Sequence, residues 1–187
     1  MIWKFTDNKS RDSIEQQFDW ARNMNEVPQD KLYHAEGNVA VHTWKVIEEL
    51  QQLPAYSDLG GQDKEILWTA ALLHDVEKRS ATVVESDGRI TARGHARKGE
   101  YTVRTLLYRD LPTPFAIREK IASLVRFHGL PLWLMEKTDP VRKIAEVAFR
   151  LDTSQLRMLA EADIRGRICQ DREELLESLD LFELFCR

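Results

Sequence analysis

The segment Ala70–Arg79 constrains the fold of this chain most, because an apolar helical run in it ends in the adjacent pair His74 and Asp75. Neighbouring residues of an α-helix are about 100° apart, so these two side chains cannot both occupy the centre of one helix face. They can lie on either side of one metal ion, or Asp75 can bridge two ions. The segment therefore indicates a polar site at the end of a buried helix.

Four more polar residues each continue the apolar stripe of a separate predicted helix, and they are His42, His95, His128 and Asp163. A single His on such a stripe is more often a hydrogen-bonded core histidine. Burying several of these groups without a shared partner, however, would cost on the order of 1 to 3 kcal/mol each. A shared metal ion removes that cost, so we expect the helices to converge on a metal site.

The residue types of this set indicate which metal ions fit. Neutral imidazole nitrogens and carboxylate oxygens bind divalent metals at about 2 to 2.5 Å, and a rigid helix bundle can aim them inward from several helices. Such a set suits one or two ions of Mn, Co, Ni, Fe or Zn better than Ca.

The length and composition favour a single, mainly helical domain over residues 1–187. A chain of 187 residues can bury one sizeable core, and its 8 Gly and 6 Pro are few. Turn residues around Asp87–Gly88, flanked by β-favouring residues, predict one small hairpin over 82–91. Helical periodicity and capping signals predict helices over 13–24, 39–53, 67–74, 95–106, 113–128, 139–152, 153–167 and 172–185.

The remaining composition bears on compartment and partners. No run approaches eighteen apolar residues, and the first residues lack the apolar centre of a secretory signal, so we expect a cytoplasmic protein without a membrane span. Cys169 and Cys186 have no metal-ligand spacing and are interpreted as ordinary thiols. A net charge of −4 argues against a broad duplex-binding surface, although local cation clusters could hold a phosphate.

The order of the polar residues resembles that of a known family. His42, the pair His74–Asp75 and the distant Asp163 resemble the HD superfamily of metal-dependent phosphohydrolases, and Leu72–Lys78 is similar to its most diagnostic segment. The resemblance spans about residues 34–168 and implies an all-α HD-domain helical bundle, here with one β-hairpin insertion. It implies the following first-metal ligands: His42, His74, Asp75 and Asp163. His95 and His128 match the second-metal histidines in order and approximate spacing.

Two flanking motifs narrow the resemblance. Tyr33–Asn38 and Ala162–Arg167 look like parts of the HD domains of bacterial CCA-adding enzymes and of HD-plus-polynucleotide-kinase proteins that heal RNA ends. These relatives imply hydrolysis of 2′,3′-cyclic phosphates and of 2′- or 3′-phosphates on RNA ends. They also suggest an N-terminal module followed by a kinase in a longer protein. The chain itself has no Gly-rich phosphate loop, so we expect no kinase activity from it.

The expected mechanism is metal-assisted attack of water on phosphorus, with Asp75 at its centre. Lys78 matches the family Lys that follows the His-Asp pair, and Arg167 lies one helical turn beyond Asp163. With Arg79, these cations are predicted to bind phosphate, although a solvated helix end explains each one equally well when taken alone. His34 is also assigned to catalysis, and its role is left open between metal ligand, supporting group and general acid.

Two alternatives to RNA end healing remain open from the sequence. The first is a nucleoside 5′-monophosphate phosphohydrolase, which preference for free nucleotides over oligomer ends would favour. The second is a degenerate HD module that binds a nucleotide or RNA end as a regulatory domain. Degeneration usually begins with loss of ligands, and no ligand is missing here.

Overall fold

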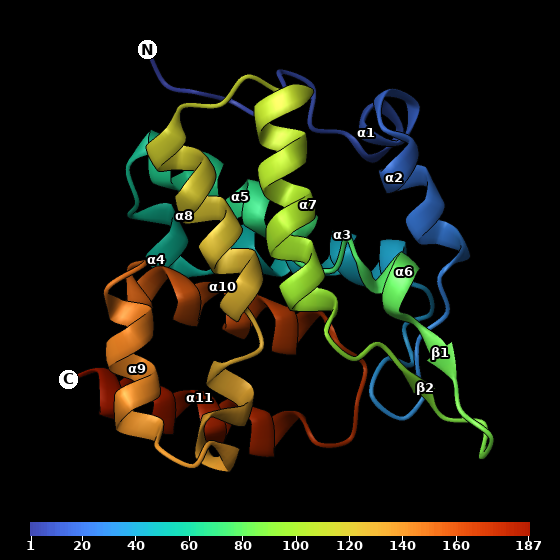
Figure 1. Ribbon diagram of the computed structural model, residues 1–187, viewed down its shortest axis with the longest axis vertical. Coiled ribbons are helices and arrows are strands. Elements are labelled where there is room, and N and C mark those ends of the chain that lie inside the picture. Colours follow the sequence, from blue (N-terminus) through green and yellow to red (C-terminus); the bar gives the residue numbers. More distant parts are fainter.

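Helix α5 (Gly61–Leu73) lies at the centre of the fold because its C-terminal part, after Glu65, has no charged face. Its eight consecutive residues from Ile66 to Leu73 are buried, as expected of a helix without a polar face. Helices α3 (Val39–Gln52), α8 (Phe115–Phe127) and α10 (Thr153–Gly166) pack against it, and α7 (His95–Arg109) packs on α8. Figure 1 shows α7 and α8 side by side in front of α5.

The computed structural model describes residues 1–187, and the remaining elements cover this central group on two sides. Helix α9 (Pro140–Ala148), helix α11 (Arg172–Cys186) and the 3-10 helix η2 (Pro131–Glu136) form a lower layer with α10 (Figure 1). The other elements are α1 (Arg11–Gln17), α2 (Asp19–Asn23), η1 (Met24–Glu26), α4 (Pro54–Ser57) and α6 (Lys78–Ala81). None of the helices combines the length and apolar character that crossing a bilayer requires.

One close helix crossing brings two predicted ligands together. A Cβ atom added to Gly166 would lie 2.9 Å from Val46 Cγ2 and 3.0 Å from the Val46 nitrogen, so only glycine allows α3 and α10 to approach this closely. His42 lies one helical turn before Val46, and Asp163 lies three residues before Gly166. The crossing therefore places both side chains in the same buried space.

The structure confirms an all-α fold with one small hairpin. Strands β1 (Val83–Val84) and β2 (Ile90–Thr91) pair antiparallel, with Val83 opposite Thr91. Gly88 provides the turn with a φ of 85°, which matches the predicted Asp-Gly signal. The hairpin packs beside the loop before α3, since Asp30 Oδ2 accepts a hydrogen bond from the Ile90 N–H at 3.0 Å.

Several predicted helix boundaries were wrong. The helix predicted over 13–24 breaks at Phe18, which has extended backbone, and the Phe18 ring packs 5.3 Å from that of Phe5. Aromatic packing thus overrides helical periodicity there. The helix predicted over 139–152 ends at Ala148, because Asp152 instead caps α10 by accepting from the Ser154 N–H. The short elements α4, α6 and η2 were not predicted from the sequence.

Candidate metal centre

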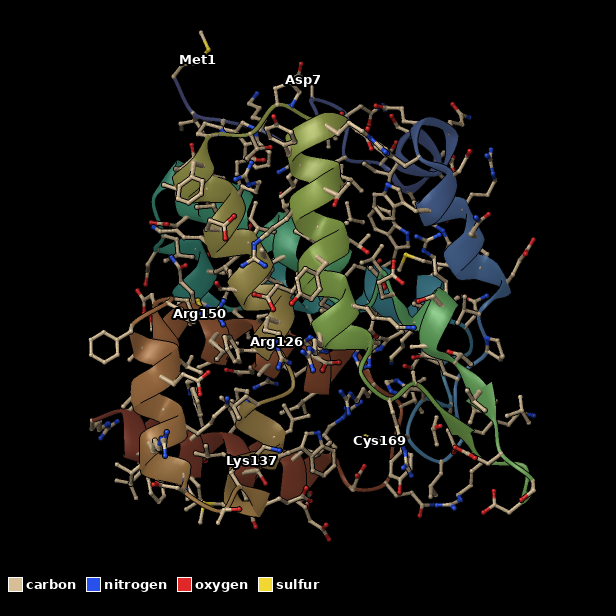
Figure 2. The ribbon with its side chains drawn as sticks, in the orientation of Figure 1. Met1, Asp7, Arg126, Lys137, Arg150 and Cys169 are labelled. Atoms are coloured by element: carbon tan, nitrogen blue, oxygen red, sulfur yellow. The ribbon has the colours of Figure 1, made fainter.

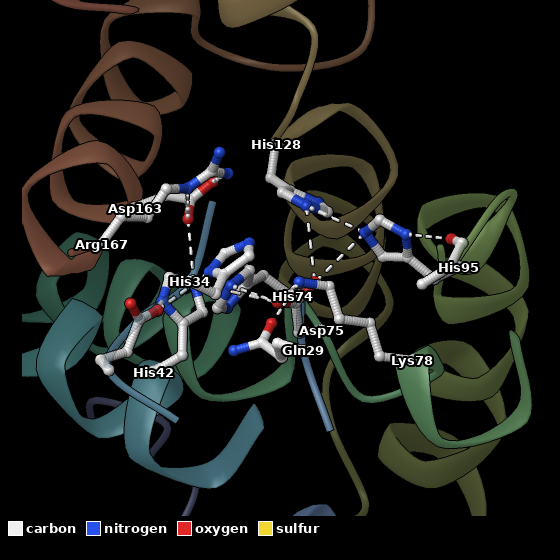
Figure 3. A network of polar contacts seen from close by, with 12 residues as sticks. Gln29, His34, His42, His74, Asp75, Lys78, His95, His128, Asp163 and Arg167 are labelled. Atoms are coloured by element: carbon white, nitrogen blue, oxygen red, sulfur yellow. Dashed lines mark hydrogen bonds and ion pairs between the residues drawn. The ribbon is translucent and has the colours of Figure 1, made fainter. Parts of the chain in front are cut away.

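The six predicted ligands meet between the central helices (Figure 3). His42 extends from α3, His74 and Asp75 follow α5, and His95 is the first residue of α7. The other two come from the ends of helices: His128 follows α8 and Asp163 lies in the last turn of α10. All six side chains are within the interior of the fold, and only His95 is partly exposed, at 22% of its side chain.

Asp75 lies between two pairs of histidines. Its Oδ1 is 3.2 Å from His95 Nε2 and 3.8 Å from His128 Nε2. Its Oδ2 is 3.2 Å from His74 Nε2 and 3.9 Å from His42 Nε2. The donor atoms of each pair and of Asp75 lie within 4.8 Å of one another. Asp75 can therefore bridge two ions, which was one of the two arrangements predicted.

The His74–Asp75 pair lies directly after α5, which ends at Leu73. His74 is the C-cap residue, and the chain then turns, with the Lys78 N–H donating to the Asp75 carbonyl at 2.9 Å. His74 keeps helical backbone angles (φ −57°, ψ −35°), and the two side chains meet at the site, where His74 Nε2 lies 3.2 Å from Asp75 Oδ2.

Three of the histidines are oriented by the same backbone contact. The Nδ1 atoms of His74, His95 and His128 each contact the carbonyl three residues earlier, at Ala71 (2.7 Å), Ala92 (2.7 Å) and Val125 (2.8 Å). A carbonyl can only accept, so Nδ1 carries the proton in each ring. In the neutral form the Nε2 lone pair then faces Asp75, which is the orientation that a metal ligand needs.

These lone pairs need a cation. His95 Nε2 and His128 Nε2 are 3.3 Å apart, and with both Nδ1 atoms protonated their lone pairs face each other. His74 Nε2 and Asp75 Oδ1 are buried and make no hydrogen bond. Bound protons can meet part of this demand, since the pKa of His74 is raised by Asp75 and Asp163 against the opposing effect of burial. The residues thus fit a divalent metal, which competes with protons for them.

Glu36 holds two rings at once, and the sequence analysis did not assign it to the site. Its Oε1 lies 2.9 Å from His34 Nδ1 and 2.8 Å from His42 Nδ1, the second contact being poorly aligned for a hydrogen bond. Its Oε2 accepts from the Ile168 N–H at 2.9 Å. Burial raises the pKa of Glu36, but the contacts with His34 and His42 outweigh it and lower that pKa. The only sequence signal was an acid two residues after His34.

Asp163 is paired with Arg167. The guanidinium donates through Nε (3.1 Å) and Nη2 (2.6 Å) to the two carboxylate oxygens, while Asp163 Oδ1 is 3.0 Å from His42 Nε2. Burial would raise the pKa of Asp163, yet Arg167 and His42 hold it well below its usual range. Asp163 contacts His42 but lies outside all three groups whose donor atoms are within 4.8 Å of one another, of which the third is His34, Glu36 and His42.

Lys78 lies against the Asp75 carboxylate. Its Nζ is 2.8 Å from Asp75 Oδ2 and donates to Gln29 Oε1 at 2.7 Å, in a buried environment. Burial would raise the pKa of Asp75, but His74 and Lys78 hold it well below its usual range. Gln29, which the sequence analysis also did not assign to the site, thus orients the cation.

Arg79 is not brought to this centre. Its Nη2 lies 3.2 Å from Glu77 Oε1, and its side chain lines a different cavity with Trp20 and Tyr101.

Two cavities open from the metal centre to the surface, of about 220 Å³ and about 630 Å³. They share one boundary, formed by His34, Lys78, His95, Trp133 and Arg167. Burial lowers the pKa of His34 to about 4, with only partial opposition from Glu36, so this boundary holds a neutral imidazole beside two cations.

Comparison with known proteins agrees with the geometry. The family model of the HD domain matches residues 39–163, well over half of the chain. The chain belongs to the HD domain family. The match includes all six predicted ligands, from His42 to Asp163, whereas His34, Glu36 and Arg167 lie outside it. An HD domain implies a metal-dependent phosphohydrolase, and the His and Asp groups of this one could hold the metal.

A curated relative of this HD domain is a multifunctional CCA protein from Nitrosococcus oceani. The two are 29% identical over 152 residues, which cover 75% of this chain and 33% of the relative. The chain therefore spans about a third of the length of that relative.

Proposed function

We propose that this HD domain removes 2′,3′-cyclic phosphates and 2′- or 3′-phosphates from RNA ends. The observation that carries the proposal is the position of Asp75, with one oxygen toward each histidine pair and two cations beside the cavities. Water attack on a phosphate ester needs a metal site open on one side and positive charge near the phosphoryl oxygens.

The chain's own residues divide the work. We propose that one ion is held by His42, His74, Asp75 and Asp163, and a second by Asp75, His95 and His128. When bound, a divalent ion of Mn, Co, Ni, Fe or Zn supplies the Lewis acidity that activates water and neutralises phosphoryl charge. The protein contributes the orientation of the imidazoles and excludes competing water from the buried half of the site.

Lys78 and Arg167 bind the phosphate in this proposal, because both line the boundary shared by the two cavities. His34 lines the same boundary, and its Nδ1 is taken by Glu36, so Nε2 is the ring atom left for the substrate. With the proton on Nδ1, Nε2 carries a lone pair and can accept a hydrogen bond from a substrate hydroxyl or from the attacking water.

RNA is proposed as the substrate on two grounds. The flanking motifs Tyr33–Asn38 and Ala162–Arg167 resemble those of RNA end-healing HD domains, and the curated relative is a CCA protein. We also propose a cytoplasmic location and a covalent fusion to a polynucleotide kinase in the full-length protein.

The test is release of inorganic phosphate, and opening of a cyclic end, from short RNA oligomers with added Mn, Co or Ni. Hydrolysis that depends on metal and is lost in His74→Ala supports the proposal. Full activity of His74→Ala would contradict the metal assignment.

A nucleoside 5′-monophosphate phosphohydrolase is the competing function. The smaller cavity favours it, because about 220 Å³ of space lined by Gln29, Asp30 and Tyr33 offers room for a single nucleoside. Faster hydrolysis of free 5′-nucleotides than of any oligomer end would decide for it.

A further inference from the structure

The two cavities at the metal centre differ sharply in charge. Beyond their shared boundary, the smaller one is lined by Asp30 and Asp171 and by no further cation. The larger one is lined by four more cations and by no carboxylate except Asp75, and these cations are Arg97, Arg126, Lys137 and Lys143. This concentration of positive charge contrasts with the net charge of −4 of the whole chain.

The four cations belong to separate segments rather than to one solvated helix face. Arg97 lies in the first turn of α7, Arg126 in the last turn of α8, Lys137 directly after η2, and Lys143 on α9. Figure 2 shows Arg126 near the end of α8 and Lys137 in the lower layer. Cations that line one cavity from several directions focus the field inside it and attract an extended anion.

Two of these cations are paired within the protein and two are not. The paired ones are Arg126, which lies 3.4 Å from Glu100, and Lys143, which lies 2.8 Å from Glu146. Exposed Arg97 and Lys137 form no ion pair or side-chain hydrogen bond with any residue of the chain. Their charges are therefore available to a ligand.

Trp133 adds a flat apolar surface at the junction of the two cavities. It lines both of them and is 43% exposed, which is unusual for so large an aromatic side chain. Its backbone departs from helical geometry within η2, with φ −122° and ψ 21°. Nucleobases stack on exposed aromatic rings of this kind whatever their sequence.

We infer that the larger cavity binds the phosphodiester backbone of a single-stranded oligonucleotide whose last phosphate reacts at the metal centre, with Trp133 stacking on a base near that end. Arg97 and Lys137 contact backbone phosphates. The inference rests on the proposed function only in placing the reacting phosphate. It makes the preferred substrate a strand end rather than a free nucleotide.

The first test measures binding without chemistry. A labelled RNA hexamer with a plain 3′-hydroxyl is titrated with the metal-loaded protein by fluorescence anisotropy at several salt concentrations. The double variant Arg97→Ala/Lys137→Ala is expected to weaken binding about tenfold or more. The slope of log affinity against log salt should fall by about 0.7 for each lost phosphate contact.

Matched controls separate this site from general charge. Lys120→Ala/Arg142→Ala removes the same charge from positions that do not line the cavity, and should leave the salt slope unchanged. Trp133→Ala should weaken hexamer binding about tenfold, and Trp133→Phe should restore most of it. An equal effect of the cavity pair and the control pair would overturn the inference.

Kinetics separate this inference from the proposed function. KM is measured for a phosphate-ended hexamer and for the matching mononucleotide. In Arg97→Ala/Lys137→Ala, the KM of the hexamer should rise about tenfold more than the KM of the mononucleotide. Phosphate release with the same KM change for both substrates would overturn the inference while the proposed function stands. Absence of hydrolysis, with hexamer binding still dependent on Arg97 and Lys137, would overturn the proposed function and support the inference.

Discussion

The two halves of the metal centre share Asp75 but are held in place by different means. In the inner half, the Ala71 carbonyl orients His74, and charged side chains hold two further ligands: Glu36 contacts His42, and Arg167 pairs with Asp163. His42 is only 1% exposed there. Ligands fixed by ionic partners in a buried space are preorganised for a metal ion.

In the outer half, backbone carbonyls alone orient the rings. His95 contacts the Ala92 carbonyl and His128 that of Val125, while His95 is 22% exposed and lines both cavities. Because its ligands have fewer partners and are more exposed, the outer half should lose its metal ion more easily than the inner half. We therefore expect a tightly held inner ion and a weaker outer ion next to the substrate.

The largest effect should come from Asp75, which both halves share. Asp75→Asn keeps the shape but removes the charge, so both ions should be lost and phosphate release should fall by at least about 10³-fold. Metal content per chain, measured by mass spectrometry beside the activity, checks this. A variant that kept one tightly bound ion would show that the inner half does not depend on Asp75.

Single ligand substitutions should separate the halves. His128→Ala should release the outer ion and retain the inner one, with activity about 10²-fold lower. His42→Ala should reduce the content of both ions, because loss of the inner ion leaves Asp75, which the outer ion also needs, less ordered. Circular dichroism must show unchanged helix content in both variants. Equal metal content in the two variants would abolish the proposed asymmetry.

Glu36→Gln sharpens the comparison further. The amide cannot match the charge that orients His34 and His42, so the affinity of the inner ion should fall about 10- to 100-fold. Outer-ion affinity should change little. Competition with a metal indicator gives both constants, and Glu48→Gln, an exposed position on α3, is the matched control. A loss confined to the outer ion would reverse the assignment.

The stability of the metal-free protein should fall as the pH falls from 7.5 to 5.0. In the folded protein, burial lowers the pKa of His34 to about 4 and that of His128 to about 3, whereas a histidine of the unfolded chain has a pKa of 6.5. Below pH 6.5 the unfolded chain therefore binds more protons than the folded protein. The stability that these two neutral histidines contribute is fully present above pH 6.5 and is lost as the pH falls toward their folded pKa values. The raised pKa of His74 acts in the opposite direction, adding stability below 6.5.

Two groups oppose one, so we expect the Tm in a chelator to drop by several degrees over this range. Thermal melts followed by circular dichroism measure it. His128→Gln, which cannot take up a proton at this position, should flatten the dependence. A Tm that rises on acidification would mean that His74 dominates.

The metal ligands could be predicted because they are polar residues at positions where helical periodicity calls for apolar ones. His42 and His128 continue apolar helix stripes, and polar residues at such positions need a partner that sequence spacing can suggest. Glu36 and Gln29 could not be found in this way. They lie in a loop without periodicity, and the carboxylate of Glu36 accepts a hydrogen bond from the Ile168 N–H, 132 residues away in the chain.

The same limit explains the fold boundaries and the charged cavity. Phe18 satisfies helical spacing but is drawn into packing with Phe5, a tertiary contact that outweighs a weak propensity. Arg126 and Lys143 have the spacing of ordinary solvated helix residues. Only the arrangement of α8 and α9 in space shows that both line one cavity.

Arg79 should mark the outer limit of the centre. If Arg79 bound phosphate, as the sequence predicts, its loss in Arg79→Ala would raise KM strongly. Its contact with Glu77, at 37% side-chain exposure, instead resembles a surface ion pair worth at most about 1 kcal/mol. We expect kcat/KM to change less than about threefold, whereas Lys78→Ala, at the adjacent but buried position, removes the charge beside Asp75 and should cost far more. A tenfold effect of Arg79→Ala on KM would extend the substrate site beyond the two cavities at the metal centre.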